Sequence, residues 1–213
     1  KFLRKMFLST DLVLKAYEKG LFPMSDSNYD PYIYWVEPKE RGIIDLNEFK
    51  VSRSLWKVIK KKKYSIQVNN NFEKVIKLCA KNKYRESSWI NKQIIENYVK
   101  LHKLGFAKSI ECFSKGHLVG GLYGIVVGKI FCGESMFSIK KDASKVALTY
   151  LVALLKQAKF KFIDTQFYSD HLSQFGTKKI SKSEYQKILT DNGSLDNPNF
   201  PLKLDKLITE YFK

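Results

Sequence analysis

The sequence predicts an α+β protein in which one central helix covers one face of a mainly antiparallel sheet. From Leu118 to Ser138, two apolar runs rich in small residues flank Val127-Gly128-Lys129, the glycine-containing reversal expected of a hairpin. A strand from Lys108 to Phe113 precedes this pair, so we expect an antiparallel meander. The segment from Ala143 to Gln157 is apolar on almost every side, which is typical of a buried central helix.

The composition indicates a packed globular protein with a strong positive charge. The chain has 213 residues, of which 44% are hydrophobic and 14% aromatic, enough for one large core or two modest ones. A net charge of +17 attracts polyanions, so nucleic acid is the leading class of partner, although a general bias toward lysine would produce the same total. No run approaches the roughly 18 apolar residues of a spanning helix, so we expect no membrane contact.

Three cysteines, Cys79, Cys112 and Cys132, lie far apart in apolar segments. They match neither a disulfide framework nor a metal-binding spacing, so we expect buried free thiols in a reducing compartment, the cytoplasm. The chain begins at Lys1 without a methionine, which leaves open whether a targeting segment once preceded it.

The elements at the N-terminus are predicted to be short. Ser9-Thr10-Asp11 offers an N-cap for a first helix that Gly20 ends, and residues 20–24 are expected to form an ordered apolar loop. Short extended pieces are expected at residues 32–35 and 41–44, where aromatic and β-branched residues cluster.

A helix that starts at Ser52 ends in a run of four lysines, and we place the domain boundary there. This divides the chain into a small N-terminal domain, residues 1–60, and a larger domain, residues 61–213. The basic side chains of this helix either contact nucleic-acid phosphates or form an ordinary solvated helix end. They are Arg53, Lys57, Lys60, Lys61, Lys62 and Lys63.

Two amphipathic helices are predicted before the meander. In the first, apolar residues follow the helical spacing i, i+3, i+4, i+7 at Phe72, Val75, Ile76 and Cys79. The second is expected from Asn91 to Leu104 and is followed by Gly105. Residues 114–117 then form the turn between the first two strands of the meander.

After the meander, Asp142 is the expected N-cap of the central helix. Residues 161–167 follow it as a strand, in which Asp164 and Gln166 are two positions apart and therefore share a face. Ser181 and Glu184 form the capping box of a last helix.

Three polar residues stand in segments that otherwise look like core: Glu134, Asp164 and Gln166. Glu134 lies in an uncharged run and must be hydrogen-bonded, paired or placed at a wet cleft, unless it simply points to solvent. The residues lack a metal-binding pattern, and neither Ser135 nor Ser138 has a histidine at a spacing that would indicate a catalytic pair. The three could instead hydrogen-bond an amine and stabilise charge while it attacks a carbonyl.

Several motifs resemble the leucyl/phenylalanyl-tRNA–protein transferases. They are LVGGLYG at 118–124, FCGESMFS at 131–138, ASK at 143–145 and IDTQ at 163–166, with GLFP at 20–23, VSRS at 51–54, WI at 89–90 and HL at 171–172. The resemblance runs in order from about residue 11 to 190. It implies a small N-terminal domain joined to an N-acetyltransferase-like (GNAT-like) domain. It also implies transfer of Leu, Phe or Met from aminoacyl-tRNA to the α-amine of proteins that begin with Lys or Arg, which marks them for degradation through the N-degron pathway.

The resemblance assigns roles by position. Asp164 and Gln166 match the catalytic pair, and Glu134 matches the carboxylate beside it. The walls of the donor side-chain pocket are matched by Leu122, Met136 and Ile163, with Leu148, Leu151 and Leu155 on the helix behind them. Trp35, Trp89 and Ser138 match positions near the tRNA 3′ end and the acceptor peptide. Where the family often has two successive tryptophans, this chain has Trp35-Val36.

The mechanism implied needs neither a covalent intermediate nor a cofactor, because the ester of aminoacyl-tRNA is already activated. We expect Gln166 to accept a hydrogen bond from the attacking amine. Asp164 is expected to orient Gln166 and offset positive charge on the nitrogen, and Glu134 to help hold the basic first residue of the acceptor. The partners would be aminoacyl-tRNA and protein substrates, and we expect a monomer.

Three alternatives remain at this level. A different donor such as arginine would need a carboxylate deep in the pocket, and Glu134 is the candidate. A CoA-dependent N-acetyltransferase would carry a glycine-rich turn before the central helix, but residues 140–145 contain no glycine. A non-enzymatic tRNA-binding module assigns no role to Asp164 or Gln166.

Overall fold

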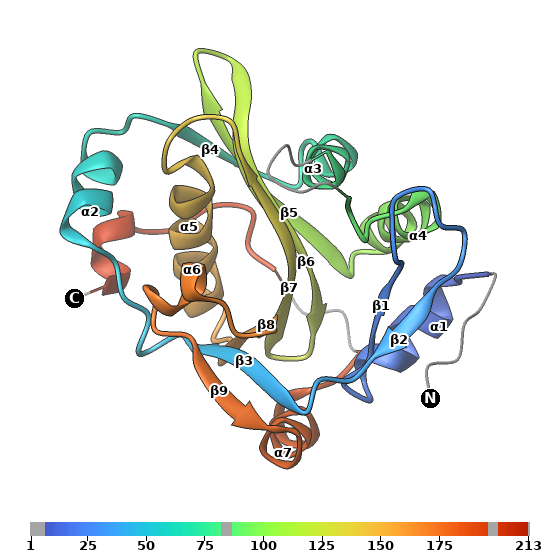
Figure 1. Cartoon of the computed structure of the whole chain (residues 1–213). Helices are drawn as coiled ribbons and strands as arrows, with labels where there is room; N and C mark the ends of the chain where they lie inside the picture. Colours follow the sequence, from blue (N-terminus) through green and yellow to red (C-terminus); the bar gives the residue numbers. More distant parts are fainter. Residues whose placement is uncertain (1–6, 82–86, 196–199, 213) are drawn as a thin grey trace.

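The computed structural model describes residues 7–81, 87–195 and 200–212. Figure 1 shows a curved sheet with helix α5 (Ala143–Gln157) on one face and α3 (Phe72–Ala80) and α4 (Lys92–Lys103) on the other. Every strand pairing is antiparallel except that of β7 with β8. The predicted α+β class with a mainly antiparallel sheet is therefore confirmed.

The large sheet has the strand order β4-β5-β6-β7-β8-β3-β9. Its members are β3 (Glu40–Asp45), β4 (Ser65–Val68), β5 (Ala107–Ser114), β6 (His117–Val127), β7 (Ile130–Ser138), β8 (Phe162–Gln166) and β9 (Lys178–Ser181). Strands β5, β6 and β7 form the predicted meander. The reversal between β6 and β7 contains Gly128 at φ +57°, a left-handed conformation that glycine adopts without strain.

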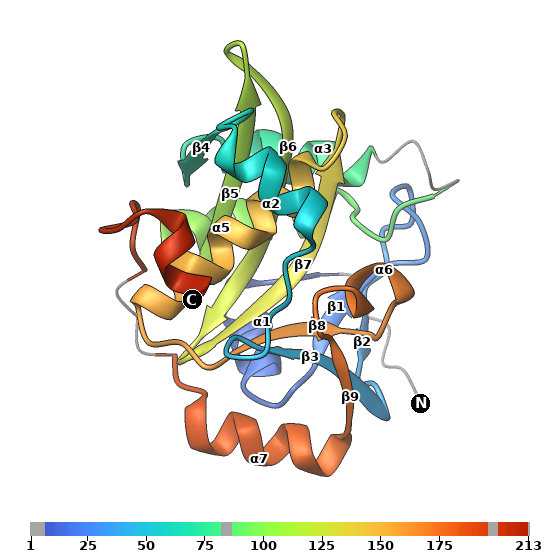
Figure 2. The ribbon, with the colours of Figure 1, turned by 90° about the vertical axis from the view of Figure 1, so that its left-hand side faces the viewer.

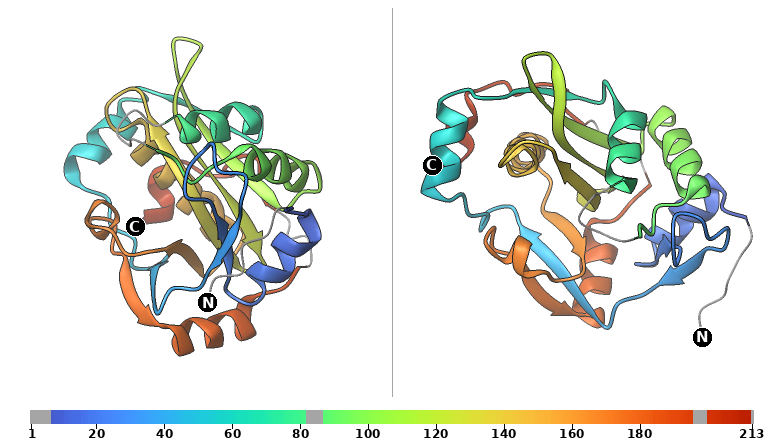
Figure 3. Two further views of the ribbon diagram at one scale, coloured as in Figure 1. Left: turned by 45° about the vertical axis from the view of Figure 1, so that its right-hand side comes forward. Right: turned by 45° about the horizontal axis from the view of Figure 1, so that its top comes forward.

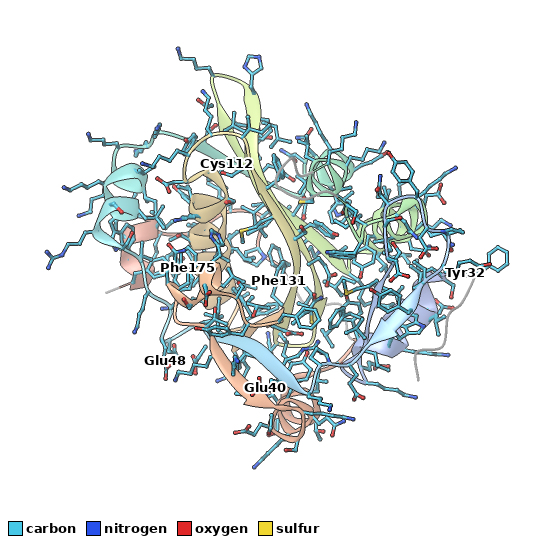
Figure 4. The ribbon with its side chains drawn as sticks, viewed as in Figure 1. Tyr32, Glu40, Glu48, Cys112, Phe131 and Phe175 are labelled. Atoms are coloured by element: carbon cyan, nitrogen blue, oxygen red, sulfur yellow. The ribbon has the colours of Figure 1, made fainter. Side chains whose placement is uncertain are left out.

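Helix α5 crosses over between β7 and β8, as the sequence pattern predicts for a central helix. It packs against β5, β6 and β7 on its inner side, while α2 (Arg53–Lys60) and η1 (Ile208–Phe212) cover its outer side. Figure 2 shows α2 and α5 in front of the sheet, and the right panel of Figure 3 shows α5 end-on inside the curve of the sheet. Figure 4 labels Phe131 and Phe175, which both belong to the core on this α5 side.

The capping of α5 differs from the prediction. Asp142 occupies the N-cap position, but its φ is +64° and its side chain makes no capping hydrogen bond. The hydroxyl of Ser138, at the end of β7, instead accepts a hydrogen bond of 3.3 Å from the backbone N–H of Ser144. The left-handed backbone at residue 142 departs from the extended conformation in which an N-cap side chain reaches the helix.

The N-terminal segment is more regular than predicted. The N-cap of helix α1 (Thr10–Tyr17) is Ser9, which belongs to the run Ser9-Thr10-Asp11 predicted to cap it. The prediction of a loop over residues 20–24 is wrong, because β1 (Phe22–Met24) pairs with β2 (Tyr34–Val36) in an antiparallel ribbon. A strand of three residues with a proline at its centre has no periodic pattern of its own, so its partner decides its structure.

The remaining elements follow the predicted patterns or extend them. The apolar faces of α3 and α4 are buried, and α7 (Lys182–Asn192) begins with the predicted capping box. The short helices α6 (Asp170–Ser173) and η1 and the edge strands β4 and β9 were not predicted, because elements of four or five residues carry too little periodicity. All three cysteines are buried, as predicted.

The predicted division of the chain at residue 60 stays a prediction. Strand β3 and helix α2 both precede this point, yet β3 pairs with β8 and β9 in the large sheet, and α2 packs on α5. Among the described residues, no helix is both long enough and apolar enough to cross a membrane.

Candidate active site

The two strands that carry the predicted polar residues separate soon after they pair. Strands β7 and β8 are hydrogen-bonded in parallel only from Ile130 to Cys132 and from Phe162 to Asp164. Beyond this short ladder β7 continues to Ser138 while β8 ends at Gln166. Glu134 and Gln166 therefore lie on either side of the point where the sheet opens.

A backbone irregularity directs each of these side chains. Where β6 pairs with β7, the register skips Glu134, so this residue is the extra one of a β-bulge. Where β3 pairs with β8, the register skips Thr165, the residue before Gln166. Bulges change the direction of side chains along a strand. Here they bring Nε2 of Gln166 within 2.8 Å of Oε1 of Glu134.

Glu134 is buried among hydrogen-bond donors from three other elements. The hydroxyl of Tyr17 donates to its Oε1 at 2.5 Å, Nε2 of Gln166 donates to the same oxygen at 2.8 Å, and the hydroxyl of Tyr98 donates to its Oε2 at 3.3 Å. Burial raises the pKa of Glu134 to about 7, although the hydrogen bonds from Tyr17 and Gln166 act in the opposite direction. The carboxyl group of Glu134 is therefore buried and held by neutral donors.

Gln166 is held in an unusual backbone conformation. Its φ is +62°, and the N–H of Phe167 donates to the carbonyl of Thr165 at 2.7 Å, which closes a γ-turn around Gln166. A left-handed non-glycine residue is unfavourable by about 1–3 kcal/mol, and such strain is concentrated at functional sites. Here the backbone N–H of Gln166 donates to Oδ1 of Asp164 at 2.8 Å, which stabilises the turn.

The hydrogen bond with Glu134 fixes which end of the Gln166 side-chain amide faces the carboxylate. Because the neighbouring oxygen of Glu134 accepts, the Nε2 end of the amide must face it, and the Oε1 end must face away. No described residue donates to Oε1. This oxygen can therefore accept an N–H from a molecule that enters where β7 and β8 diverge.

Asp164 forms a buried ion pair with Arg41, a residue that was not predicted from the sequence. Arg41 of β3 donates from Nε to Oδ1 at 2.9 Å and from Nη2 to Oδ2 at 2.6 Å, and Tyr185 of α7 also donates to Oδ2, at 2.7 Å. The side chains of Arg41 and Asp164 are 2% and 0% exposed. Burial alone would lower the pKa of Arg41, but the ion pair and hydrogen bonds with Asp164 raise it.

A signal for Arg41 was present in the sequence. It begins the apolar run Arg41-Gly42-Ile43-Ile44, and a charge at the start of such a strand requires a buried partner. In the structure its Nη1 also donates to the carbonyl of Gly20 at 2.7 Å, and its guanidinium carbon lies 4.1 Å from the centre of the Tyr185 ring. Arg41 thus joins the N-terminal segment to the site.

The residues of the predicted donor pocket lie on the other face of the sheet. All six of its residues belong to the core on the α5 side: Leu122, Met136, Ile163, Leu148, Leu151 and Leu155. Met136 is half-buried and the other five are buried. Met136 follows Glu134 on the part of β7 beyond the ladder with β8, so it borders the opening of the sheet.

Both predicted aromatic contacts lie on the side of α1 and α4. Trp35 of β2 and Trp89, which precedes α4, are half-buried against the core on that side. The carbonyl of Trp89 accepts two hydrogen bonds from Ser25, at 3.3 Å from its N–H and 2.9 Å from its hydroxyl. Ser138 lies at the end of β7, where its hydroxyl also donates to the carbonyl of Lys140 at 2.7 Å.

The predicted phosphate contacts are all exposed side chains at α2, on the α5 side of the sheet. They are Arg53, Lys57, Lys60, Lys61, Lys62 and Lys63. Within residues 7–81, 87–195 and 200–212, no group of three or more His, Cys, Asp and Glu side chains is placed to hold a metal ion.

Comparison with known proteins finds similarity along most of the chain. A model of the family "Leucyl/phenylalanyl-tRNA protein transferase" matches residues 43–190, and a model of the N-terminal domain of that family matches residues 6–39. A leucyl/phenylalanyl-tRNA–protein transferase of Maricaulis maris is 47% identical over 180 residues, which cover 84% of this chain and 83% of the relative. One of Ruegeria sp. is 47% identical over 193 residues, which cover 91% and 90%.

Solved structures show lower similarity. L-PGS from Bacillus licheniformis aligns with a TM-score of 0.43 and 12% identity, over 74% of this chain and 54% of that one. A GCN5-related N-acetyltransferase-like protein from Streptococcus suis aligns with a TM-score of 0.36 and 12% identity, over 81% and 64%.

Proposed function

The chain belongs to the leucyl/phenylalanyl-tRNA protein transferase family, and from this premise we propose how its site works. It is an aminoacyltransferase that moves Leu or Phe, and to some extent Met, from aminoacyl-tRNA to the α-amine of a protein. We propose acceptors that begin with Lys or Arg, which the added residue marks for degradation. We further propose that the enzyme works as a monomer in the cytoplasm.

In the reaction, the amine nitrogen bonds to the ester carbonyl carbon, and the bond from that carbon to the ribose oxygen of tRNA breaks. The amine loses a proton and the released ribose oxygen gains one. The ester is already activated, so the enzyme must mainly bring the two groups together in the correct orientation. We propose that Oε1 of Gln166 accepts a hydrogen bond from the attacking amine and aligns it with the carbonyl.

Of the two roles expected for Asp164, the structure supports the orientation of Gln166 but not the offset of positive charge on the substrate nitrogen. Its carboxylate is completely buried and its charge is matched by Arg41, so a charge on the substrate nitrogen would meet a neutral pair. What Asp164 does contact is the backbone N–H of Gln166. We propose that Asp164 positions Gln166, and that Arg41 fixes Asp164.

The surroundings of Glu134 support a positioning role too. Both of its oxygens already accept hydrogen bonds from Tyr17, Tyr98 and Gln166, and the residue is 8% exposed. We propose that Glu134 orients the amide of Gln166. The contact with the basic first residue of the acceptor, which the resemblance suggested, would be made through the small exposed part of this carboxylate.

One observation carries this proposal: Gln166 is held in a strained turn by two carboxylates, with its amide oxygen open to a ligand. The decisive variant is Gln166→Gly. Glycine adopts φ +62° without strain, so the turn should persist while the amide is removed. Losing a positioned polar group of this kind reduces the rate by roughly 10²–10³-fold.

The assay should measure transfer from Leu-, Phe-, Met- and Arg-tRNA to model proteins that begin with Lys, Arg, Asp or Glu. We expect product with the first three donors and with Lys or Arg acceptors only. A wild-type protein that transfers no amino acid would refute the proposed function. A Gln166→Gly variant with normal rates would leave the function standing and refute the role of Gln166.

A further inference from the structure

Two aromatic side chains follow Gln166 directly and point into solvent. Phe167 is 47% exposed and Tyr168 is 38% exposed, whereas Gln166 is only 5% exposed. The γ-turn causes this contrast, because it ends β8 and turns the following residues outward. Large apolar side chains beside a reactive group are candidates for ligand contact.

The position of Phe167 is fixed although its side chain is exposed. Its ring meets the buried ring of Phe22 edge to face, with centroids 5.6 Å apart and planes at 84°. Its backbone lies close to Gly42 of β3, where an added Cβ would come within 2.7 Å of the Phe167 carbonyl. An aromatic ring that is already fixed loses little conformational freedom when a ligand stacks on it.

Its neighbours connect Phe167 to the rest of the site. Phe22 belongs to β1, where its strand partner is Val36, next to Trp35. The Phe22 ring also lies 5.1 Å from the guanidinium carbon of Arg41, which fixes Asp164. Phe167 therefore stands between the β1–β2 ribbon and the turn that holds Gln166.

Lys179, which lies beside the Tyr168 ring, favours a nucleotide over a basic acceptor peptide as the ligand of this surface. Nζ of Lys179 lies 5.3 Å from the centre of the Tyr168 ring and 3.3 Å from a carboxylate oxygen of Glu40. Because Glu40 already neutralises Lys179, a phosphate would have to replace this carboxylate as the partner of the lysine, which the basic first residue of an acceptor cannot do. Aromatic rings next to a lysine suit a nucleotide, whose base stacks while its phosphate meets the cation.

We propose that Phe167 is a stacking platform for an unpaired base at the 3′ end of the donor tRNA, with Lys179 near the adjoining phosphate. This inference rests on the proposed function, which makes aminoacyl-tRNA the donor. The single-stranded end of a tRNA offers several unpaired bases close to the ester. Stacking on Phe167 would bring the ester to Gln166, one residue away along the chain.

The test compares Phe167→Ala, Phe167→Leu and Phe167→Trp in steady-state transfer from Leu-tRNA. We expect the KM for Leu-tRNA to rise roughly 5- to 100-fold in the alanine variant, less in the leucine variant, and little in the tryptophan variant. The KM for the acceptor should stay at the wild-type value. Tyr32→Ala is the matched control, because Tyr32 is 43% exposed and projects from the outer edge of the N-terminal segment (Figure 4).

A second measurement needs no transfer reaction. A 3′-end oligonucleotide with 2-aminopurine in place of a terminal base should lose fluorescence on binding, and the loss should be smaller with Phe167→Ala than with the wild type or Phe167→Trp. A fluorescence loss as large as that of the wild type, together with an unchanged KM for Leu-tRNA, in folded Phe167→Ala would overturn the platform. A rise in the acceptor KM alone would also overturn it, since the ring would then face the acceptor. Absence of transfer by the wild type would instead refute the function.

Discussion

Arg41 and Asp164 form a buried, bidentate ion pair, in which Nη2 lies 2.6 Å from Oδ2 and Nε lies 2.9 Å from Oδ1. The pair joins β3 to β8, and Asp164 in turn holds the backbone of Gln166. Removing the arginine would leave a buried, uncompensated carboxylate, so the pair supports both folding and the geometry of the site.

The first prediction separates the contribution of the Arg41–Asp164 pair to folding stability from its contribution to the geometry of the site. Arg41→Ala should lower the free energy of unfolding by about 3–5 kcal/mol, because a buried charge loses its partner. The double variant Arg41→Met/Asp164→Leu should recover more than half of this loss and still transfer poorly, since the N–H of Gln166 loses its acceptor. Urea unfolding and transfer rates measure the two quantities. Lys182→Ala, which breaks the partly exposed pair with Glu37, is the control. Normal transfer by the double variant would contradict the positioning role.

The second prediction concerns pH. The pKa of Glu134 is raised to about 7 by burial, against 4.5 in the unfolded chain. Between these values the folded protein binds the proton more tightly than the unfolded chain, so stability falls as the pH rises from about 4.5 to 7. Relative to Glu134→Gln, which does not titrate, the wild type should lose up to about 3 kcal/mol over this range.

Urea unfolding of both proteins at pH 5 and pH 8 tests this expectation. Glu96→Gln is the matched control, because it removes the same charge from a glutamate whose side chain is 54% exposed. If wild type and Glu134→Gln show the same dependence on pH, Glu134 does not carry a raised pKa.

The third prediction concerns the predicted donor pocket and follows from volume. Met136→Ala enlarges the space beside the opening of the sheet, and Ile163→Phe fills it. The first change should reduce transfer of Leu more than of Phe, and the second should block Phe before Leu. The ratio of the transfer rate from Leu-tRNA to that from Phe-tRNA should shift several-fold to about a hundredfold, since each methylene-sized contact contributes roughly 1 kcal/mol.

Relative rates from Leu-tRNA and Phe-tRNA provide the measurement, with thermal unfolding of both variants in parallel. Ile163 is 2% exposed, so the stability of Ile163→Phe must be checked before its rates are interpreted. An unchanged Leu-to-Phe ratio in two folded variants would identify these residues as ordinary core.

The fourth prediction concerns the basic end of α2. Replacing Lys60, Lys61, Lys62 and Lys63 by Gln should weaken tRNA binding and flatten its salt dependence by a log–log slope of roughly 0.7–0.9 for each contact removed. The matched control replaces four exposed lysines on or directly after α3 and α4 and changes the net charge equally; they are Lys74, Lys77, Lys81 and Lys103. Equal weakening by both sets would show a general effect of charge rather than contact at α2.

The sequence by itself determined the elements whose pattern is local and repeats. The hairpin at Gly128, the buried faces of α3 and α5 and the capping box at Ser181 all depend on spacings of two to seven residues. The same local reasoning marked Glu134, Asp164 and Gln166, because polar residues in apolar strands need a partner.

Only the tertiary structure decided which partners they have. Arg41 and Asp164 are 123 positions apart, and Tyr17 and Glu134 are 117 apart, so no local pattern links them. The bulges at Glu134 and Thr165 shift a register that sequence alternation assumes to be constant. The short strands β1 and β4 exist because neighbouring strands complete their hydrogen bonds. Pairing between distant segments depends on the whole packed chain, and this is why it could not be predicted from spacing alone.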